Sequence, residues 1–136
     1  MSQSTLDDFA KLLLRIALGV LILLHGWAKL KNGIGGIEAM LAVRGLPTFL
    51  AWGVYVGEVV APLLLVLGIY TRLAAAVIAI NMMVAVFLAH SAHFAILTQS
   101  GGWRLELQAM FFIAALALAL VGAGRYALAG RNGRWN

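Results

Sequence analysis

Residues 49–70 read FLAWGVYVGEVVAPLLLVLGIY, and this stretch decides the fold. It is long enough to cross a hydrocarbon layer of about 30 Å as a helix, and Glu58 is its one charged residue. Three more apolar stretches follow the same pattern, and none alternates with the period of two typical of a β-barrel strand. We therefore predict an all-α integral membrane protein, a four-helix transmembrane bundle forming a single domain over residues 1–136. The predicted helices cover residues 9–30, 49–70, 73–96 and 105–122.

The composition supports a location in the membrane. Of the 136 residues, 63% are hydrophobic and 11% are charged, whereas soluble domains are about half apolar and about a quarter charged. Four helices of roughly 20 residues use most of this length and leave no room for a separate catalytic domain. Cysteine is absent, which excludes a self-contained thiol–disulfide relay, a thiolate-bound iron–sulfur cluster and a cysteine zinc site.

The positions of the basic residues indicate what the chain binds and on which side of the membrane its termini lie. The net charge is +5, but the cations are scattered at helix ends, where lipid headgroups would meet them, so we expect a lipid bilayer as partner and no nucleic acid. Four helices place both termini on one side, and six of the ten Lys and Arg residues fall on that side, which favours cytoplasmic termini. These six are Lys11, Arg15, Arg72, Arg125, Arg131 and Arg134.

Glu58 lies near the middle of the second predicted helix, too deep to reach the headgroups. Charged side chains at the bilayer centre cost about 2.5–3.5 kcal/mol on insertion scales, so such a residue is a functional candidate. It must be protonated or paired with a cation, or else serve as a packing group that ties helices together by a hydrogen bond. Pro62, four residues later, cannot donate a backbone hydrogen bond to the Glu58 carbonyl. This spacing predicts a kink and a cavity beside the carboxyl group.

The first predicted helix carries cations on one face. Arg15 and Lys29 are two heptads apart, with Gly19 and Gly26 between them on the same side. Glycines on that face permit close approach of a neighbouring helix. The alternative is that both cations extend to the headgroups at opposite interfaces. His25 lies to one side of this face.

Histidines end the third predicted helix. His90 and His93 have a spacing that can share a metal ion, but two imidazoles alone do not make a stable site, so no metal site is assigned. His25 and His90 fall at similar depth, which leaves haem, or a metal bound by His25, His90 and His93, as an alternative. Asn81 is expected to face away from His90, because nine residues turn a helix by about 180°. Glu106 opens the fourth helix, where the helix dipole favours a carboxylate; alternatively it turns inward toward His90 or Arg104.

These polar positions resemble those of the DoxX family, from about Leu14 to Leu128. The family's usual C-terminal Ser and Asp are Ala127 and Ala129 here, so no role is transferred to those two positions. The order and spacing of the motifs carry the resemblance. They are Arg15-x-x-x-Gly19, His25-Gly26-x-x-Lys29, Gly45-Leu46-Pro47, Glu58, Leu65-x-Leu67-Gly68-x-x-Thr71-Arg72, His90, Gly101-Gly102, Glu106 and Gly122-x-Gly124-Arg125-Tyr126.

The resemblance implies a small bacterial inner-membrane protein, similar to the membrane subunit of thiosulfate:quinone oxidoreductase, in a family linked also to redox stress and quinone detoxification. The chain would then be an oxidoreductase subunit that binds a quinone or a similar apolar redox substrate, with electrons from a redox partner protein or a bound cofactor. Its catalytic candidates, which would bind or protonate the quinone oxygens, are Glu58, His25 and His90. Its substrate-binding candidates are Arg15, Lys29, Arg72 and Glu106.

Two other functions fit the same sequence. A non-enzymatic scaffold or assembly factor would use the glycine and alanine seams to dock a partner and the polar core to hold its own fold. A small-molecule transporter would require alternating access, for which one four-helix chain is small, although a homo-oligomer would provide more helices.

Overall fold

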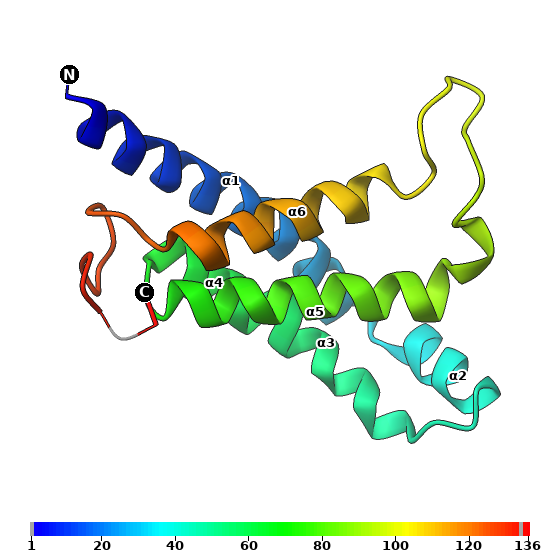
Figure 1. Ribbon diagram of the computed structural model, residues 1–136. Coiled ribbons are helices and arrows are strands. Elements are labelled where there is room, and N and C mark those ends of the chain that lie inside the picture. The colour runs from blue at the N-terminus through cyan, green and yellow to red at the C-terminus, as the bar shows by residue number, and fades with distance from the viewer. Residues whose placement is uncertain (1, 134) are drawn as a thin grey trace.

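The computed structural model describes residues 2–133 and 135–136. Arg134, one of the six basic residues expected on the side of the two termini, lies outside the described residues. Among the described residues, strand-like pairing is limited to one bridge between Leu97 and Trp103. The predicted all-α membrane fold is therefore confirmed. In chain order the helices are α1 (Gln3–Asn32), α2 (Gly35–Val43), η1 (Thr48–Trp52), α3 (Gly53–Tyr55), η2 (Val56–Val60), α4 (Ala61–Leu67), α5 (Thr71–Ala89), η3 (Ser91–His93) and α6 (Glu106–Val121) (Figure 1).

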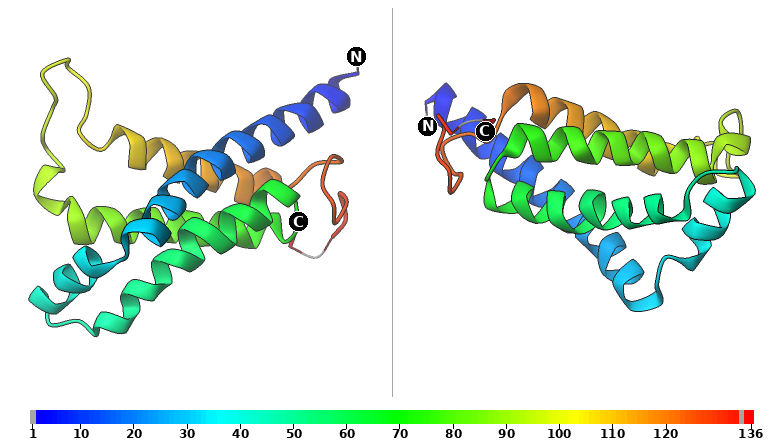
Figure 2. Two further views of the ribbon diagram at one scale, coloured as in Figure 1. Left: turned by 180° about the vertical axis from the view of Figure 1, so that it is seen from behind. Right: turned by 90° about the horizontal axis from the view of Figure 1, so that it is seen from below.

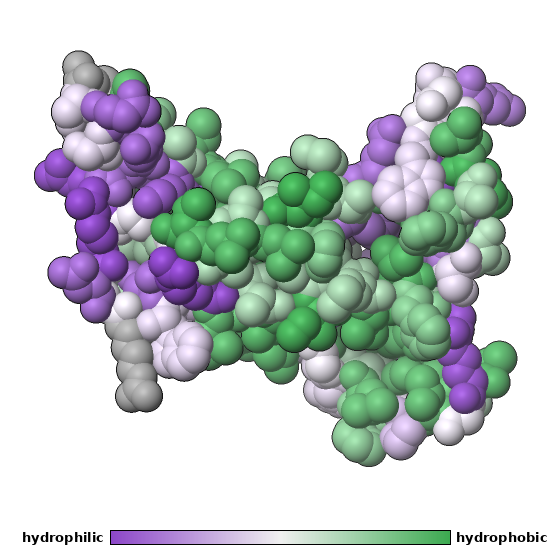
Figure 3. Space-filling model, in the orientation of Figure 1, coloured by the Kyte–Doolittle hydropathy of each residue, from purple (hydrophilic) through white to green (hydrophobic). Residues whose placement is uncertain are grey.

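Within the part of the chain that the structure describes, three helical segments are long and apolar enough to cross a membrane: α1, the composite helix Thr48–Leu67, and α5. The fourth helix, α6, is apolar but has 16 residues, or about 24 Å, somewhat less than a hydrocarbon layer of about 30 Å. On the face drawn in Figure 3, apolar side chains form a band across the middle of the molecule and polar side chains gather at its ends. The chain is thus a multi-pass membrane protein.

The long helices pack around the main apolar core, and Ile34, Leu41 and Ala51 form a second, smaller cluster. α5 and α6 run antiparallel and side by side, while α1 crosses α6 and packs on α4 (Figures 1 and 2). The core residues Ile22, Leu65, Ile78 and Leu118 have no exposed surface, and they come from α1, α4, α5 and α6 respectively. Both termini lie at the same end of the bundle (Figure 1), as an even number of crossings requires. We call this the terminal end and the opposite one the loop end.

The second span is not a regular α-helix. Its turn η2 is a π-helix, in which the Ala61 N–H donates to the Val56 carbonyl, and Glu58 lies inside this turn. Pro62 gives the physical reason, because it has no N–H with which to bond the Glu58 carbonyl four residues earlier. The backbone adopts the wider turn instead. The predicted kink is therefore a π-helical turn at the predicted position.

The third span ends at Ala89, earlier than the predicted end at residue 96. Arg44, which directly follows α2, donates from Nη2 to the Leu88 carbonyl at 3.1 Å and to Ser91 Oγ at 3.3 Å. These bonds satisfy a carbonyl that the last turn of α5 leaves free, and so they favour termination there. His90 has φ −130°, outside the helical range, and residues 94–105 form the long loop at the loop end (Figure 1).

The first span begins at Gln3, earlier than the predicted residue 9. The Ser2 hydroxyl caps the helix by accepting from the Thr5 N–H at 3.4 Å, which explains the earlier start. The short helix α2 lies between the first two spans.

Candidate functional site

Four of the seven candidate site residues surround one cavity of about 170 Å³, here called the Glu58 cavity. His25 and Lys29 come from α1, Glu58 from η2, and His90 from the end of α5. Polar groups that converge on largely apolar walls are typical of small-molecule sites. The other lining residues are Ile22, Met82, Ala85, Leu107, Gln108 and Phe111.

A partly buried ion pair forms one wall of the Glu58 cavity. The Glu58 side chain is 7% exposed and the Lys29 side chain 29%, and Lys29 Nζ pairs with Glu58 Oε2. The second carboxylate oxygen, Oε1, accepts from Asn81 Nδ2 at 3.4 Å. Groups from α1 and α5 thus hold the carboxylate that η2 presents, and the pair as a whole carries no net charge.

Two glycines allow these three elements to approach so closely. A Cβ at Gly26 would lie 2.8 Å from the Glu58 carbonyl carbon, and a Cβ at Gly57 would lie 2.6 Å from the Asn81 Cβ. Both contacts are too short for a real side chain, so only glycine fits at either position. The Glu58 carbonyl, which Pro62 leaves without its helical hydrogen bond, therefore faces the backbone of α1 at Gly26.

The neighbouring groups fix the remaining polar side chains. The Tyr55 hydroxyl donates to the Lys29 carbonyl at 3.3 Å and holds the last turn of α1 against the second span. The His25 ring meets the Phe111 ring edge-on, with centroids 5.9 Å apart. His90 Nδ1 lies 3.3 Å from the Ala85 carbonyl. Because a carbonyl only accepts, Nδ1 carries the proton in this bond, and Nε2 is left to bind another group.

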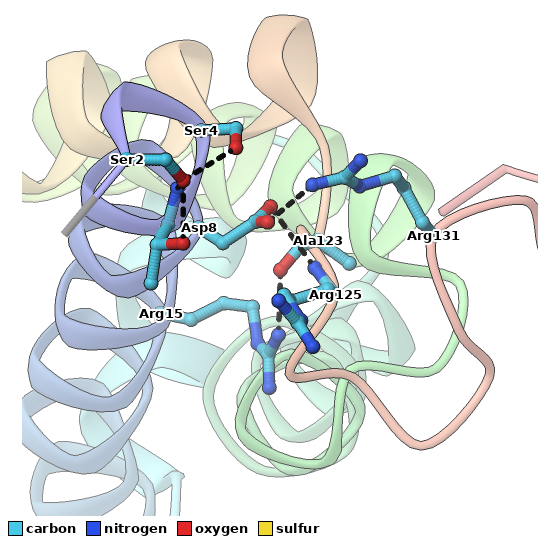
Figure 4. A network of polar contacts seen from close by, with 8 residues as sticks. Ser2, Ser4, Asp8, Arg15, Ala123, Arg125 and Arg131 are labelled. Atoms are coloured by element: carbon cyan, nitrogen blue, oxygen red, sulfur yellow. Dashed lines mark hydrogen bonds and ion pairs between the residues drawn. The ribbon is translucent and has the colours of Figure 1, made fainter.

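Arg15 does not line the Glu58 cavity; it lies near the terminal end and is 1% exposed. Its guanidinium donates to four backbone carbonyls at 2.8–3.1 Å, which joins the end of α4 to the segment after α6. Figure 4 shows the bond to the Ala123 carbonyl. All of its bonding nitrogens are thereby occupied by the protein itself. In the structure Arg15 serves as a clamp between these two segments. The four acceptors belong to Leu65, Val66, Ala123 and Tyr126.

Asp8 closes the terminal end beside Arg15 (Figure 4). It is 2% exposed, accepts from the Arg125 backbone N–H at 3.1 Å and forms an ion pair with Arg131. Since Asp8 belongs to α1 and its partners follow α6, this network fastens the two ends of the chain to each other.

Arg72 and Glu106 also lie outside the Glu58 cavity. Arg72 donates from Nε to the Asn136 main-chain oxygen at 3.0 Å and from Nη1 to the Ala119 carbonyl at 3.2 Å, at the terminal end. Glu106 is exposed, and its Oε1 accepts from the Trp103 N–H at 2.8 Å in the turn that leads into α6. The structure therefore does not unite Arg15, Arg72 and Glu106 with the four cavity residues.

The expectation that Asn81 faces away from His90 is wrong. Both lie beside Glu58, because α5 ends at Ala89 and the φ of −130° at His90 breaks the helical spacing on which the expectation depended. An amide in the middle of an otherwise apolar helix was the available signal for Asn81. Gln108, the other polar residue that the sequence did not single out as a site, lines the cavity from α6.

The haem and metal alternatives involve the same region. His25 and His90 line one cavity, and the His90 and His93 rings are 6.0 Å apart between centroids. Within residues 2–133 and 135–136, no three side chains of the metal-binding types gather closely enough to hold a metal ion.

Comparison with known proteins identifies the family. A family model described as DoxX matches residues 10–91. This range contains all four candidate residues of the Glu58 cavity, whereas α6 lies outside it. No curated protein and no solved structure matches the chain. The match to the family model extends over more than half of the sequence and includes the three long spans, apart from the first residues of α1, and the chain therefore belongs to the DoxX family.

Proposed function

We propose that this protein is a subunit of a membrane oxidoreductase system and binds a quinone, or a similar apolar redox substrate, in the Glu58 cavity. The observation that carries the proposal is the neutral Lys29–Glu58 pair on the wall of a mostly apolar cavity that His25 and His90 also line. An uncharged ring with polar oxygens fits such a site, because the walls accept the ring and the polar groups meet the oxygens.

The four polar side chains offer complementary chemistry. The Lys29 ammonium has three N–H groups, so it can bond a quinone oxygen while it remains paired with Glu58. Histidine exchanges protons near neutral pH, and His90 Nε2 is not engaged by the Ala85 carbonyl. Reduction of a quinone to a quinol consumes two electrons and two protons. We assign the electrons to a partner protein that carries a redox cofactor, and proton transfer to the quinone oxygens to Glu58, His25 and His90.

Binding measurements on purified protein test the proposal. We expect the protein in mild detergent to bind a decyl-tailed benzoquinone, and Glu58→Gln to weaken binding by roughly tenfold, because hydrogen bonds to charged groups are the stronger ones. Glu38→Gln, in α2 and outside the cavity, is the matched control and should bind as the wild type does. An absorption spectrum of the same sample reports any bound haem or flavin.

The proposal fails if the purified protein binds no quinone and Glu58→Gln leaves a linked redox phenotype intact. That result would favour the scaffold function, which the extensive clamps at Arg15 and Asp8 also suit. A scaffold further predicts that changes in the polar core lower the yield of folded protein without a separate effect on redox response.

We also propose a location in the bacterial inner membrane with both termini in the cytoplasm. The shared position of the termini and the excess of cations at the terminal end support this orientation (Figure 1). Reporter fusions at either terminus would test it: both should give the cytoplasmic signal, and a periplasmic signal would reverse the assignment.

A further inference from the structure

A second and larger cavity, of about 410 Å³, lies between α5 and α6. We call it the α5–α6 cavity. Its walls are almost entirely apolar, with Met83, Val86 and Phe87 on one side and Ala109 and Phe112 on the other. Met83 and Phe87 are 53% and 62% exposed, which places the opening on the outer, lipid-facing surface of the bundle. A molecule dissolved in the bilayer can therefore reach this cavity from the side.

The two cavities adjoin, because Met82 and Gln108 line both of them. The Oε1 atom of Gln108 is buried and makes no hydrogen bond with any of the described residues. An unsatisfied buried polar atom costs about 1–3 kcal/mol, so its position where a polar cavity meets an apolar one points to a ligand group that satisfies it.

We propose that the two cavities hold a single amphiphilic ligand. Its polar ring occupies the Glu58 cavity, its hydrocarbon tail occupies the α5–α6 cavity, and Gln108 bonds an oxygen of the ring where the two meet. The inference rests on the proposed function and specifies its substrate as a tailed, bilayer-dissolved quinone. The change from polar to apolar lining along the two cavities matches the change from ring to tail along such a molecule.

Gln108 would then select for a ring that carries oxygen substituents, and it could bond this ring in both its oxidised and its reduced form. A side-chain amide offers an acceptor oxygen and donor N–H groups, and rotation about its last bond exchanges their positions. The oxygen can accept from a hydroxyl of the reduced ring, and the amide nitrogen can donate to a carbonyl of the oxidised ring. Leucine at this position would retain the volume and lose both kinds of hydrogen bond.

The test compares two probes in nanodiscs of one lipid composition: a decyl-tailed benzoquinone and the tailless benzoquinone with the same ring. Gln108→Leu should weaken both probes, by roughly two- to tenfold for the loss of one hydrogen bond. Ala109→Phe, which fills the α5–α6 cavity alone, should weaken the tailed probe by about tenfold and change the tailless one by less than about twofold. Leu116→Phe, on α6 and outside both cavities, is the control and should change neither.

Val86→Phe fills the same cavity from α5 and replaces Ala109→Phe if that variant does not fold, as judged by helix content and thermal unfolding. The inference is overturned if the wild type binds both probes and neither the cavity-filling variant nor Gln108→Leu changes the affinities. The quinone-binding proposal then still stands. If the wild type binds neither probe, the proposed function itself fails, and this inference falls with it.

Discussion

The Lys29–Glu58 pair predicts an asymmetry between its two partners that a double-mutant cycle can measure. Glu58 is 7% exposed and depends on Lys29 and on one long hydrogen bond from Asn81, whereas Lys29 is 29% exposed and has access to the protein surface. Lys29→Met should therefore destabilise the protein more than Glu58→Gln does. In the first variant a buried carboxylate loses its counter-ion, and in the second a partly exposed ammonium retains contact with water or headgroups.

The burial of each partner sets the size of the effect. Removing one partner of a buried ion pair costs about 3–5 kcal/mol, and the partial exposure of Lys29 puts Lys29→Met near the lower end, at about 3 kcal/mol. Glu58→Gln keeps the shape of the side chain and its hydrogen bond with Asn81, so we expect a loss of about 1 kcal/mol. The double variant should be more stable than Lys29→Met alone, because it leaves no unpaired charge in the cavity wall.

Thermal unfolding in one mild detergent at neutral pH provides the measurement. For a chain of this size 1 kcal/mol corresponds to a shift of about 4 °C in Tm, so Lys29→Met should lower Tm by on the order of 10 °C and Glu58→Gln by about 4 °C. The reasoning is refuted if Glu58→Gln proves the more damaging single change. It is equally refuted if the double variant loses the sum of the two single effects, because additivity would mean that the two side chains do not interact.

Two further pairs of variants test, by thermal unfolding, the close packing at Gly26 and the clamp at Arg15. Gly26→Ala should destabilise the protein by about 1–2 kcal/mol, because overpacking against the Glu58 backbone outweighs the better helix propensity of alanine. Gly53→Ala, with open space around it, is the control and should be neutral or slightly stabilising. Equal Tm values for the two variants would contradict this expectation. Arg15→Met should lower the free energy of unfolding by about 3 kcal/mol or more, because four carbonyls lose their donor. Arg72 is exposed, so Arg72→Met should lower it by only about 1 kcal/mol. A larger shift in Tm for Arg72→Met than for Arg15→Met would contradict the clamp.

The fold was accessible from the sequence because the bilayer imposes strict requirements on it. A span must be apolar over roughly 20 residues, and this pattern is visible without knowledge of any tertiary contact. The exact ends of the spans were not accessible in the same way. α5 ends where Arg44, from a distant part of the sequence, caps the Leu88 carbonyl, and no local pattern near residue 89 encodes that contact.

The candidate site was predictable only in part. Glu58 was evident from its depth, and Lys29 was evident as a cation on a glycine-bearing face. Asn81 was misplaced, because an ideal helix was assumed to continue through His90. Gln108 gave no signal, since its proposed role depends on the unpartnered Oε1 and on two adjoining cavities that only the packed helices create.

Arg15 and Lys29 show why helical periodicity alone does not assign a role. Both lie on one face of α1, and the second span packs along that face, so the two cations meet different depths of the same neighbour. Arg15 meets the end of α4, where the last turn leaves carbonyls free to accept, and a guanidinium satisfies several of them at once. Lys29 meets the π-helical turn, where a carboxylate projects beside a cavity. The guanidinium of Arg15 is fully engaged by backbone carbonyls and so stabilises the terminal end. Lys29 retains N–H groups beyond the one that pairs with Glu58, so the groups able to bind a ligand lie around Lys29 and Glu58.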